Sequence, residues 1–341
     1  MGHVQSAPGQ RPDAFEPGDS AGQASLGFGC ASLFGLPSKR DRRAVLEAAY
    51  DLGIRHFDVA PIYGLGLAEA ELADFVAHRT DIEVATKFGL RLTTIGRWAG
   101  SAQTPIRQML RSSPALKSTV RKAGTRRSGP FAERILYTDR EYSVRSARDA
   151  LTTSLRALRV DRIEYFLLHE PSGAKVGVPR DLIEHLEHER SAGRIGHWGV
   201  AGDLSRMDAP LASFCAHATA LQFPYDLIDG HRGPRPQPGR RTITFGIVSG
   251  ALPRIENLLA RAPTVRRECS DLLGVDLGER TAVMALLVRD AVRHNPSGTV
   301  LVSSTRIGNL KMVCEAVETP LRNEEQVCCL IRQRYHAASA P

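Results

Sequence analysis

The sequence of 341 residues lacks the features that mark secreted, membrane-spanning or zinc-binding proteins. It has six cysteines and no Cys-x-x-Cys pair, so we expect no structural zinc site. No run approaches the roughly 20 apolar residues that a membrane span needs. Residues 1–24 contain no apolar segment of the kind found in secretion signals. We therefore expect a cytoplasmic protein with no metal, no membrane partner and a flexible tail over residues 1–24.

Acidic residues are scarce between Arg91 and Arg148: this stretch contains Glu133, Asp139 and Glu141, and basic residues far outnumber them. The whole chain carries a formal charge of +8, and a positive surface can attract phosphates or nucleic acid. A solvated loop is the simplest interpretation, and a phosphorylated or acidic substrate is the alternative. A nucleic-acid-binding module would need an aromatic platform or zinc-finger spacing, and neither is present, so we expect no nucleic-acid partner.

Short β-type segments alternate with amphipathic helical segments from residue 25 onward, a pattern typical of parallel strands covered by helices. The expected strands are Ser25–Cys30, His56–Ala60, Ile82–Thr86, Ile163–Leu168, Ile195–Val200, Thr219–Phe223, Thr242–Val248 and Thr299–Ser303. The expected helices are Ser38–Leu52, Leu67–Ala77, Ser143–Leu158, Arg180–Ala192, Pro253–Leu273, Arg280–Arg293, Ile307–Val317 and Asn323–Tyr335. Eight strands in this order predict an α/β fold, a (β/α)8 TIM barrel over residues 25–341.

A doubly wound open sheet is the competing fold. It would be expected to carry a Gly-x-Gly-x-x-Gly turn after its first strand, and the sequence from Gly27 to Ala31 does not match that motif.

Two stretches interrupt the alternation. Residues 91–142 form a long insertion after the third strand; this is either a substrate lid, with Trp98, Phe131 and Tyr137 as contacts, or an insertion without function. After the sixth strand, Pro234, Pro236 and Pro238 exclude a regular helix interior. The barrel should therefore have a reduced sixth helix.

Four ionisable side chains lie at or just after the ends of three successive expected strands: Asp58 and Tyr63, then Lys87, then His169. The carboxyl ends of barrel strands carry the active site in this fold. Taken singly, the tyrosine is more often a packing residue and the lysine–aspartate pair more often structural. Together they form a candidate catalytic group, because burying an ion pair without a purpose is costly.

The sequence around these residues resembles the aldo-keto reductase superfamily. Residues 53–64 match its pattern G-x-x-x-x-D-x-A-x-x-Y-G, with Glu69 and Leu72 as the usual continuation. Ala85-Thr86-Lys87 and Leu167-Leu168-His169 match its third and fourth strand ends. The similarity covers roughly residues 25–320, and the layout is nearest to bacterial and plant sugar-dehydrogenase-like members.

The resemblance implies a catalytic tetrad of Asp58, Tyr63, Lys87 and His169. A carbonyl attacked by hydride develops alkoxide charge and needs a proton donor. Tyr63 would be this acid, and the base in the reverse direction. Lys87 would favour the phenolate form, Asp58 would hold Lys87, and neutral His169 would orient the substrate oxygen.

The resemblance also implies a nicotinamide cofactor, with NADP(H) preferred and NAD(H) as the alternative. Gln222 would bind the carboxamide and Phe245 would stack on the nicotinamide. Ser303, Ser304 and Arg306 would bind the adenosine 2′-phosphate at a helix start. The chain departs from the family where Ala201-Gly202 replaces a Ser-Asn pair; Asn309, Val313 and Ser303 also differ from the usual residues.

The sequence thus predicts an NAD(P)H-dependent oxidoreductase that moves hydride reversibly between nicotinamide and an aldehyde, ketone, or sugar or other alcohol. The alternative is a weakly active or non-redox binding or regulatory protein that retains the barrel, which Ala201-Gly202 favours. No residue in the sequence identifies the small-molecule substrate or the oligomeric state.

Overall fold

A computed structural model of the chain describes residues 24–93, 140–171, 180–235 and 237–339. Within these ranges eight parallel strands close into a barrel. They are β1 (Ser25–Gly29), β2 (His56–Asp58), β3 (Glu83–Phe88), β4 (Ile163–His169), β5 (Ile195–Ala201), β6 (Ala220–Asp226), β8 (Arg241–Phe245) and β9 (Thr299–Val302). Pairing runs from β5 back to β1, on through β9 and β8 to β6, and the β5–β6 pair completes the ring. The predicted TIM barrel is confirmed.

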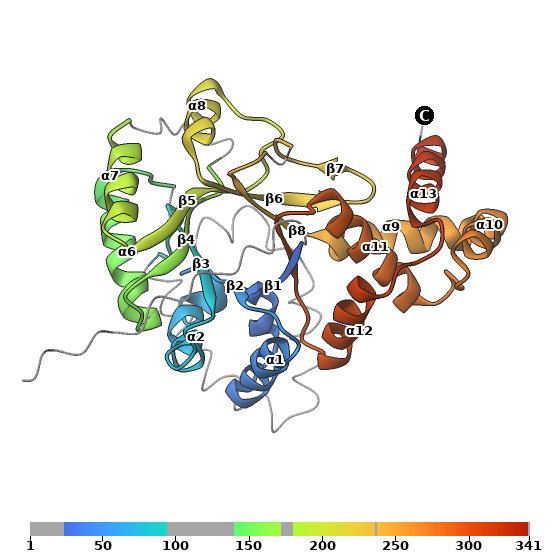
Figure 1. The fold of residues 1–341 in the computed structure, drawn as a ribbon, viewed down its shortest axis with the longest axis horizontal. Coiled ribbons are helices and arrows are strands. Elements are labelled where there is room, and N and C mark those ends of the chain that lie inside the picture. Colours follow the sequence, from blue (N-terminus) through green and yellow to red (C-terminus); the bar gives the residue numbers. More distant parts are fainter. Residues whose placement is uncertain (1–23, 94–139, 172–179, 236, 340–341) are drawn as a thin grey trace, which may run out of the picture.

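Helices surround the barrel (Figure 1). They are α1 (Lys39–Asp51), α2 (Ala68–Val76), α6 (Val144–Leu158), α7 (Arg180–Ser191), α8 (Ala209–His217), α9 (Ile247–Arg261), α10 (Pro263–Leu273), α11 (Arg280–His294), α12 (Ile307–Glu318) and α13 (Glu324–Ser339). Two short 3-10 helices, η1 (Cys30–Gly35) and η2 (Tyr63–Leu65), follow β1 and β2. Within the described ranges, no helix is both long and apolar enough to span a membrane.

The apolar residues form an inner and an outer core. Small and aliphatic side chains such as Ala85, Leu167, Ile243 and Leu301 fill the barrel interior. Larger clusters lie between the strands and the covering helices. This alternation along each strand follows from the two-residue side-chain period. It also fixes which residues at the strand ends can face the barrel axis.

The chain after β8 differs from the prediction at two points. The expected strand Thr242–Val248 is too long, because β8 ends at Phe245 and α9 begins at Ile247. The expected single helix Pro253–Leu273 is wrong as well, since it spans α9 and α10. Between them Ala262 has φ −126° and ψ 75°, outside the helical region. Pro263 follows it, and a proline disfavours the helical conformation of the residue before it.

The prediction also missed α8 and shortened β6. Asp208 caps α8 by accepting a hydrogen bond from the Leu211 amide at 2.9 Å, a start signal that the sequence contains. Strand β6 continues past the expected end at Phe223 to Asp226. It then turns into the antiparallel β7 (Gly230–His231), and the described residues between β6 and β8 contain no helix. The reduced sixth helix is therefore confirmed.

Two predictions fall largely outside the described residues. The tail over residues 1–24 is described only at Ala24. Most of the 91–142 insertion, including Trp98, Phe131 and Tyr137, also lies outside the described ranges. The lid stays a prediction.

Candidate active site

A buried ion pair joins the ends of β2 and β3. Lys87 Nζ lies 2.7 Å from each carboxylate oxygen of Asp58 and 3.0 Å from the carbonyl oxygen of Val59. From across the barrel, Gln222 Nε2 donates to Asp58 Oδ2 at 2.9 Å. Both charged residues are only 3% exposed. Burial alone would lower the pKa of Lys87, but Asp58 and Tyr63 raise it above its ordinary value, so Lys87 keeps its positive charge.

Tyr63 lies in the turn that follows β2. Its amide donates to the Ala60 carbonyl at 3.0 Å, and the next residue, Gly64, has φ 60°. A β-carbon on Gly64 would lie 2.3 Å from the Phe34 ring, so only glycine fits here. Lys87 Nζ is 5.3 Å from the Tyr63 ring centroid. Burial raises the pKa of Tyr63 more than Lys87 lowers it, so the phenol keeps its proton at neutral pH.

His169 ends β4 and faces Tyr63 edge-on, with ring centroids 6.1 Å apart. Burial, together with the nearby charges of Lys87 and Arg140, lowers the pKa of His169 to about 3, so the imidazole is neutral at physiological pH. Its Nδ1 is buried and has no hydrogen-bond partner among the described residues. Tyr142 fixes the backbone by donating to the His169 carbonyl at 2.6 Å.

These four residues open onto one cavity of about 320 Å³ at the carboxyl end of the strands, a size typical of small-molecule sites. Its other lining residues include Glu170, Ala201, Gly202, Gln222, Phe245, Ile247, Val248, Ser249, Ser303, Ser304 and Asn309. The described part of the chain contains no group of three or more His, Cys, Asp or Glu side chains that could hold a metal ion.

A family model described as the aldo/keto reductase family matches residues 25–233. The chain belongs to this family. Among curated proteins, D-threo-aldose 1-dehydrogenase from Pseudomonas sp. is 32% identical over 188 residues, which are 53% of this chain and 50% of that protein. Pyridoxal 4-dehydrogenase from Microbacterium luteolum is 44% identical over 73 residues, 20% of this chain and 21% of that protein. The match thus spans half or less of each curated relative.

Solved structures of similar fold agree with the barrel. A glycerol dehydrogenase from Gluconobacter oxydans superimposes with a TM-score of 0.62 at 18% identity, covering 94% of both chains. An aldo-keto reductase from Klebsiella pneumoniae in complex with NADPH gives a TM-score of 0.57 at 16% identity, covering 91% of this chain and 92% of that one. At these identities the likeness shows the fold alone.

The structure brings most, but not all, of the predicted cofactor residues to the cavity wall. Gln222, Phe245, Ser303 and Ser304 line it, whereas Arg306 does not and is exposed at the start of α12. The hydroxyl of Ser303 donates to the Gly29 carbonyl at 2.8 Å. The hydroxyl of Ser304 accepts from the Arg306 amide at 3.0 Å.

The first turn of α9 also forms part of this wall, which the sequence did not predict. Ile247, Val248 and Ser249 line the cavity, although the sequence assigned the first two to a strand. Their apolar, β-branched character favoured that strand. The signal that could have corrected it is Gly246, which has φ 80° and forms the N-cap of α9.

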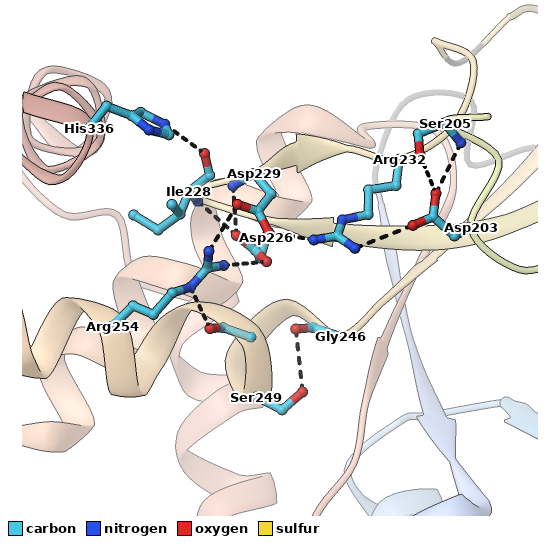
Figure 2. Close-up of polar contacts among 11 residues, drawn as sticks. Asp203, Ser205, Asp226, Ile228, Asp229, Arg232, Gly246, Ser249, Arg254 and His336 are labelled. Carbon is cyan, nitrogen blue, oxygen red and sulfur yellow. Dashed lines mark hydrogen bonds and ion pairs between the residues drawn. The ribbon is translucent and has the colours of Figure 1, made fainter. Parts of the chain in front are cut away.

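A chain of ion pairs holds the loops behind this wall together (Figure 2). Arg232 pairs with Asp203 at 3.3 Å and with Asp229 at 2.5 Å, and Arg254 pairs with Asp229 at 2.9 Å and with Asp226 at 2.8 Å. The Arg254 hydrogen bond holds the pKa of Asp229 below its usual value. The network joins the loop after β5, the β6–β7 turn and α9; of these, the loop after β5 and α9 contribute Gly202 and Ile247 to the cavity lining.

Proposed function

We propose that this chain is an NAD(P)H-dependent oxidoreductase that interconverts an aldehyde or ketone with the corresponding alcohol, or a sugar lactol with its lactone. The observation that carries the proposal is the meeting of a protonated phenol, a neutral imidazole and a buried ion pair on one cavity. The family membership agrees with it.

Each polar residue has a distinct part in the proposed reaction. The nicotinamide cofactor, when bound, supplies or accepts the hydride. Tyr63 donates its proton to the carbonyl oxygen as negative charge develops there, and takes the proton back in oxidation. Lys87 lies beside the phenol and stabilises the phenolate left after proton transfer. His169 is neutral and can donate a hydrogen bond to the same oxygen.

The cavity fits a nicotinamide dinucleotide in two respects. Gln222 Oε1 is buried and has no hydrogen-bond partner among the described residues, so it can accept from the carboxamide amine. The first turn of α9 lines the same cavity, and the leading amides of a helix have no partners within that helix. Such a helix start binds diphosphate oxygens well. We propose NADP(H) as the preferred cofactor, with Arg306 as the residue that selects it.

The proposal is tested by assaying the purified protein with a panel of aldehydes, ketones and alcohols. Nicotinamide absorbance is followed with NADPH, NADH and their oxidised forms, and cofactor binding is titrated by fluorescence. We expect turnover with at least one carbonyl. Cofactor that fails to bind even at millimolar concentration would instead support a non-redox binding or regulatory protein.

Replacing Gln222 by Met should weaken cofactor binding. The variant keeps the side-chain volume but removes the acceptor for the carboxamide, so the Kd for both NADPH and NADH should rise about 3- to 10-fold. Fluorescence titration measures it. Gln237→Met, at an exposed site outside the cavity, is the matched control. Equal Kd values for the Gln222 variant and the wild type would contradict the assignment.

Replacing Arg306 by Ala should separate the two cofactors. Loss of a charge-assisted contact to the 2′-phosphate should raise the Kd for NADPH about 10- to 100-fold and leave that for NADH unchanged. Arg322→Ala removes a comparable exposed charge in the connection between α12 and α13 and serves as the control. If both cofactors weaken equally, Arg306 does not select between them.

A further inference from the structure

Glu170 is a charged residue of the cavity that the proposed reaction does not use. It directly follows His169 and lines the same cavity. The other two charged residues there, Asp58 and Lys87, neutralise each other across 2.7 Å. Among the described lining residues, Glu170 is therefore the carboxylate left to interact with a bound molecule.

The backbone holds Glu170 in an unusual conformation. Its φ is 52°, in the left-handed region that non-glycine residues rarely adopt. Its amide donates to the Ala201 carbonyl at 2.6 Å, which ties the residue to the end of β5. Strained backbone of this kind concentrates at functional sites, where the surrounding structure maintains it.

Gly202 makes room for this conformation. A β-carbon on Gly202 would lie 3.1 Å from the Glu170 α-carbon, closer than an ordinary van der Waals contact. An asparagine at position 202 would therefore push against the Glu170 backbone. The Glu170 conformation therefore depends on glycine at position 202, where the family usually has the asparagine of its Ser-Asn pair.

The Glu170 carboxylate is oriented from one side only. Arg140 Nη2 donates to Oε2 at 3.0 Å, and Arg140 is not among the cavity-lining residues. The side chain of Glu170 is 56% exposed. An ionised carboxylate has about four acceptor sites, so the contact with Arg140 leaves most of them available.

We propose that Glu170 selects neutral, hydroxyl-bearing carbonyl substrates, such as short hydroxyaldehydes and sugar lactols. It accepts a hydrogen bond from a substrate hydroxyl and repels substrates that carry a carboxylate or phosphate. This inference rests on the proposed oxidoreductase function. It also decides against the acidic substrate that the basic segment of the sequence left open.

Two matched substrate pairs test the inference with Glu170→Ala and Glu170→Gln. The first pair is glyceraldehyde and propanal, and the second is 4-oxobutanoate and butanal. In Glu170→Ala the ratio of kcat/KM for glyceraldehyde to that for propanal should fall about 10- to 100-fold, because a hydrogen bond to a charged group is lost. Glu170→Gln keeps one acceptor oxygen, so its glyceraldehyde-to-propanal ratio should lie between the ratios of the wild type and Glu170→Ala. The ratio of kcat/KM for 4-oxobutanoate to that for butanal should rise about tenfold in both variants, because Glu170 no longer repels the substrate carboxylate.

Glu256→Gln is the control. The Glu256 carboxylate pairs with Arg280 at 2.5 Å and does not line the cavity. In this variant both kcat/KM ratios should keep their wild-type values. Unchanged ratios in the Glu170 variants, or an equal loss for glyceraldehyde and propanal, would overturn the inference while leaving the oxidoreductase intact. A wild-type protein that reduces neither propanal nor butanal, nor any carbonyl of the wider panel, would instead count against the proposed function itself.

Discussion

Tyr63→Phe should lower kcat for carbonyl reduction by about 10²- to 10⁴-fold, the usual contribution of a positioned general acid. The substitution removes one oxygen and keeps the ring that packs edge-on against His169. Because the cofactor contacts proposed for Gln222 and Phe245 do not involve the phenol, the Kd for NADPH should stay within about twofold. Stopped-flow or steady-state nicotinamide absorbance measures kcat, and fluorescence titration measures the Kd.

Tyr335→Phe is the control, since this half-buried tyrosine lies on α13 and is not part of the cavity lining. The pH dependence adds a second check. Because the pKa of Tyr63 is raised above 10.0, the protonated acid is present below that value and is lost only above it. The reduction rate should therefore show no loss of this acid near neutral pH. A Tyr63→Phe variant that turns over at the wild-type rate would exclude the phenol as the proton donor.

The barrel and the grouping of the four polar residues could be predicted from the sequence for a simple geometric reason. Parallel strands all end at the same edge of the sheet, so polar residues at the carboxyl ends of β2, β3 and β4 must lie close together once the strands are recognised. Asp58 and His169 are the last residues of their strands, and Lys87 is the last but one. Local sequence patterns were therefore sufficient to predict the barrel and the grouping of these residues.

Contacts across the barrel could not be predicted in the same way. The hydrogen bond from Gln222 to Asp58 joins residues 164 positions apart, and no local spacing encodes it. The family resemblance predicted that Lys87 would favour the Tyr63 phenolate and so lower the pKa of Tyr63, but not that burial would outweigh this effect. Glu170 gave no signal either, because a left-handed φ at a non-glycine residue depends on neighbours such as Gly202.

Lys87→Met should reduce the free energy of unfolding by about 3–5 kcal/mol, as expected when one partner of a buried ion pair is removed. Asp58, which is 3% exposed in the wild type, would be left with Gln222 as its hydrogen-bond donor from across the barrel. Urea denaturation followed by circular dichroism measures the loss. Arg43→Met, at a half-exposed pair with Glu47, should change the unfolding free energy by no more than about 1 kcal/mol.

The double variant Asp58→Asn, Lys87→Met separates the structural from the chemical part of the pair. Removing both charges eliminates the buried, unpaired carboxylate, so most of the lost stability should return. Activity should not return, since no cation then stabilises the Tyr63 phenolate. If the double variant is as unstable as Lys87→Met alone, the cost lies in the lost packing of the lysine stem and its bond to the Val59 carbonyl rather than in the unpaired charge of Asp58.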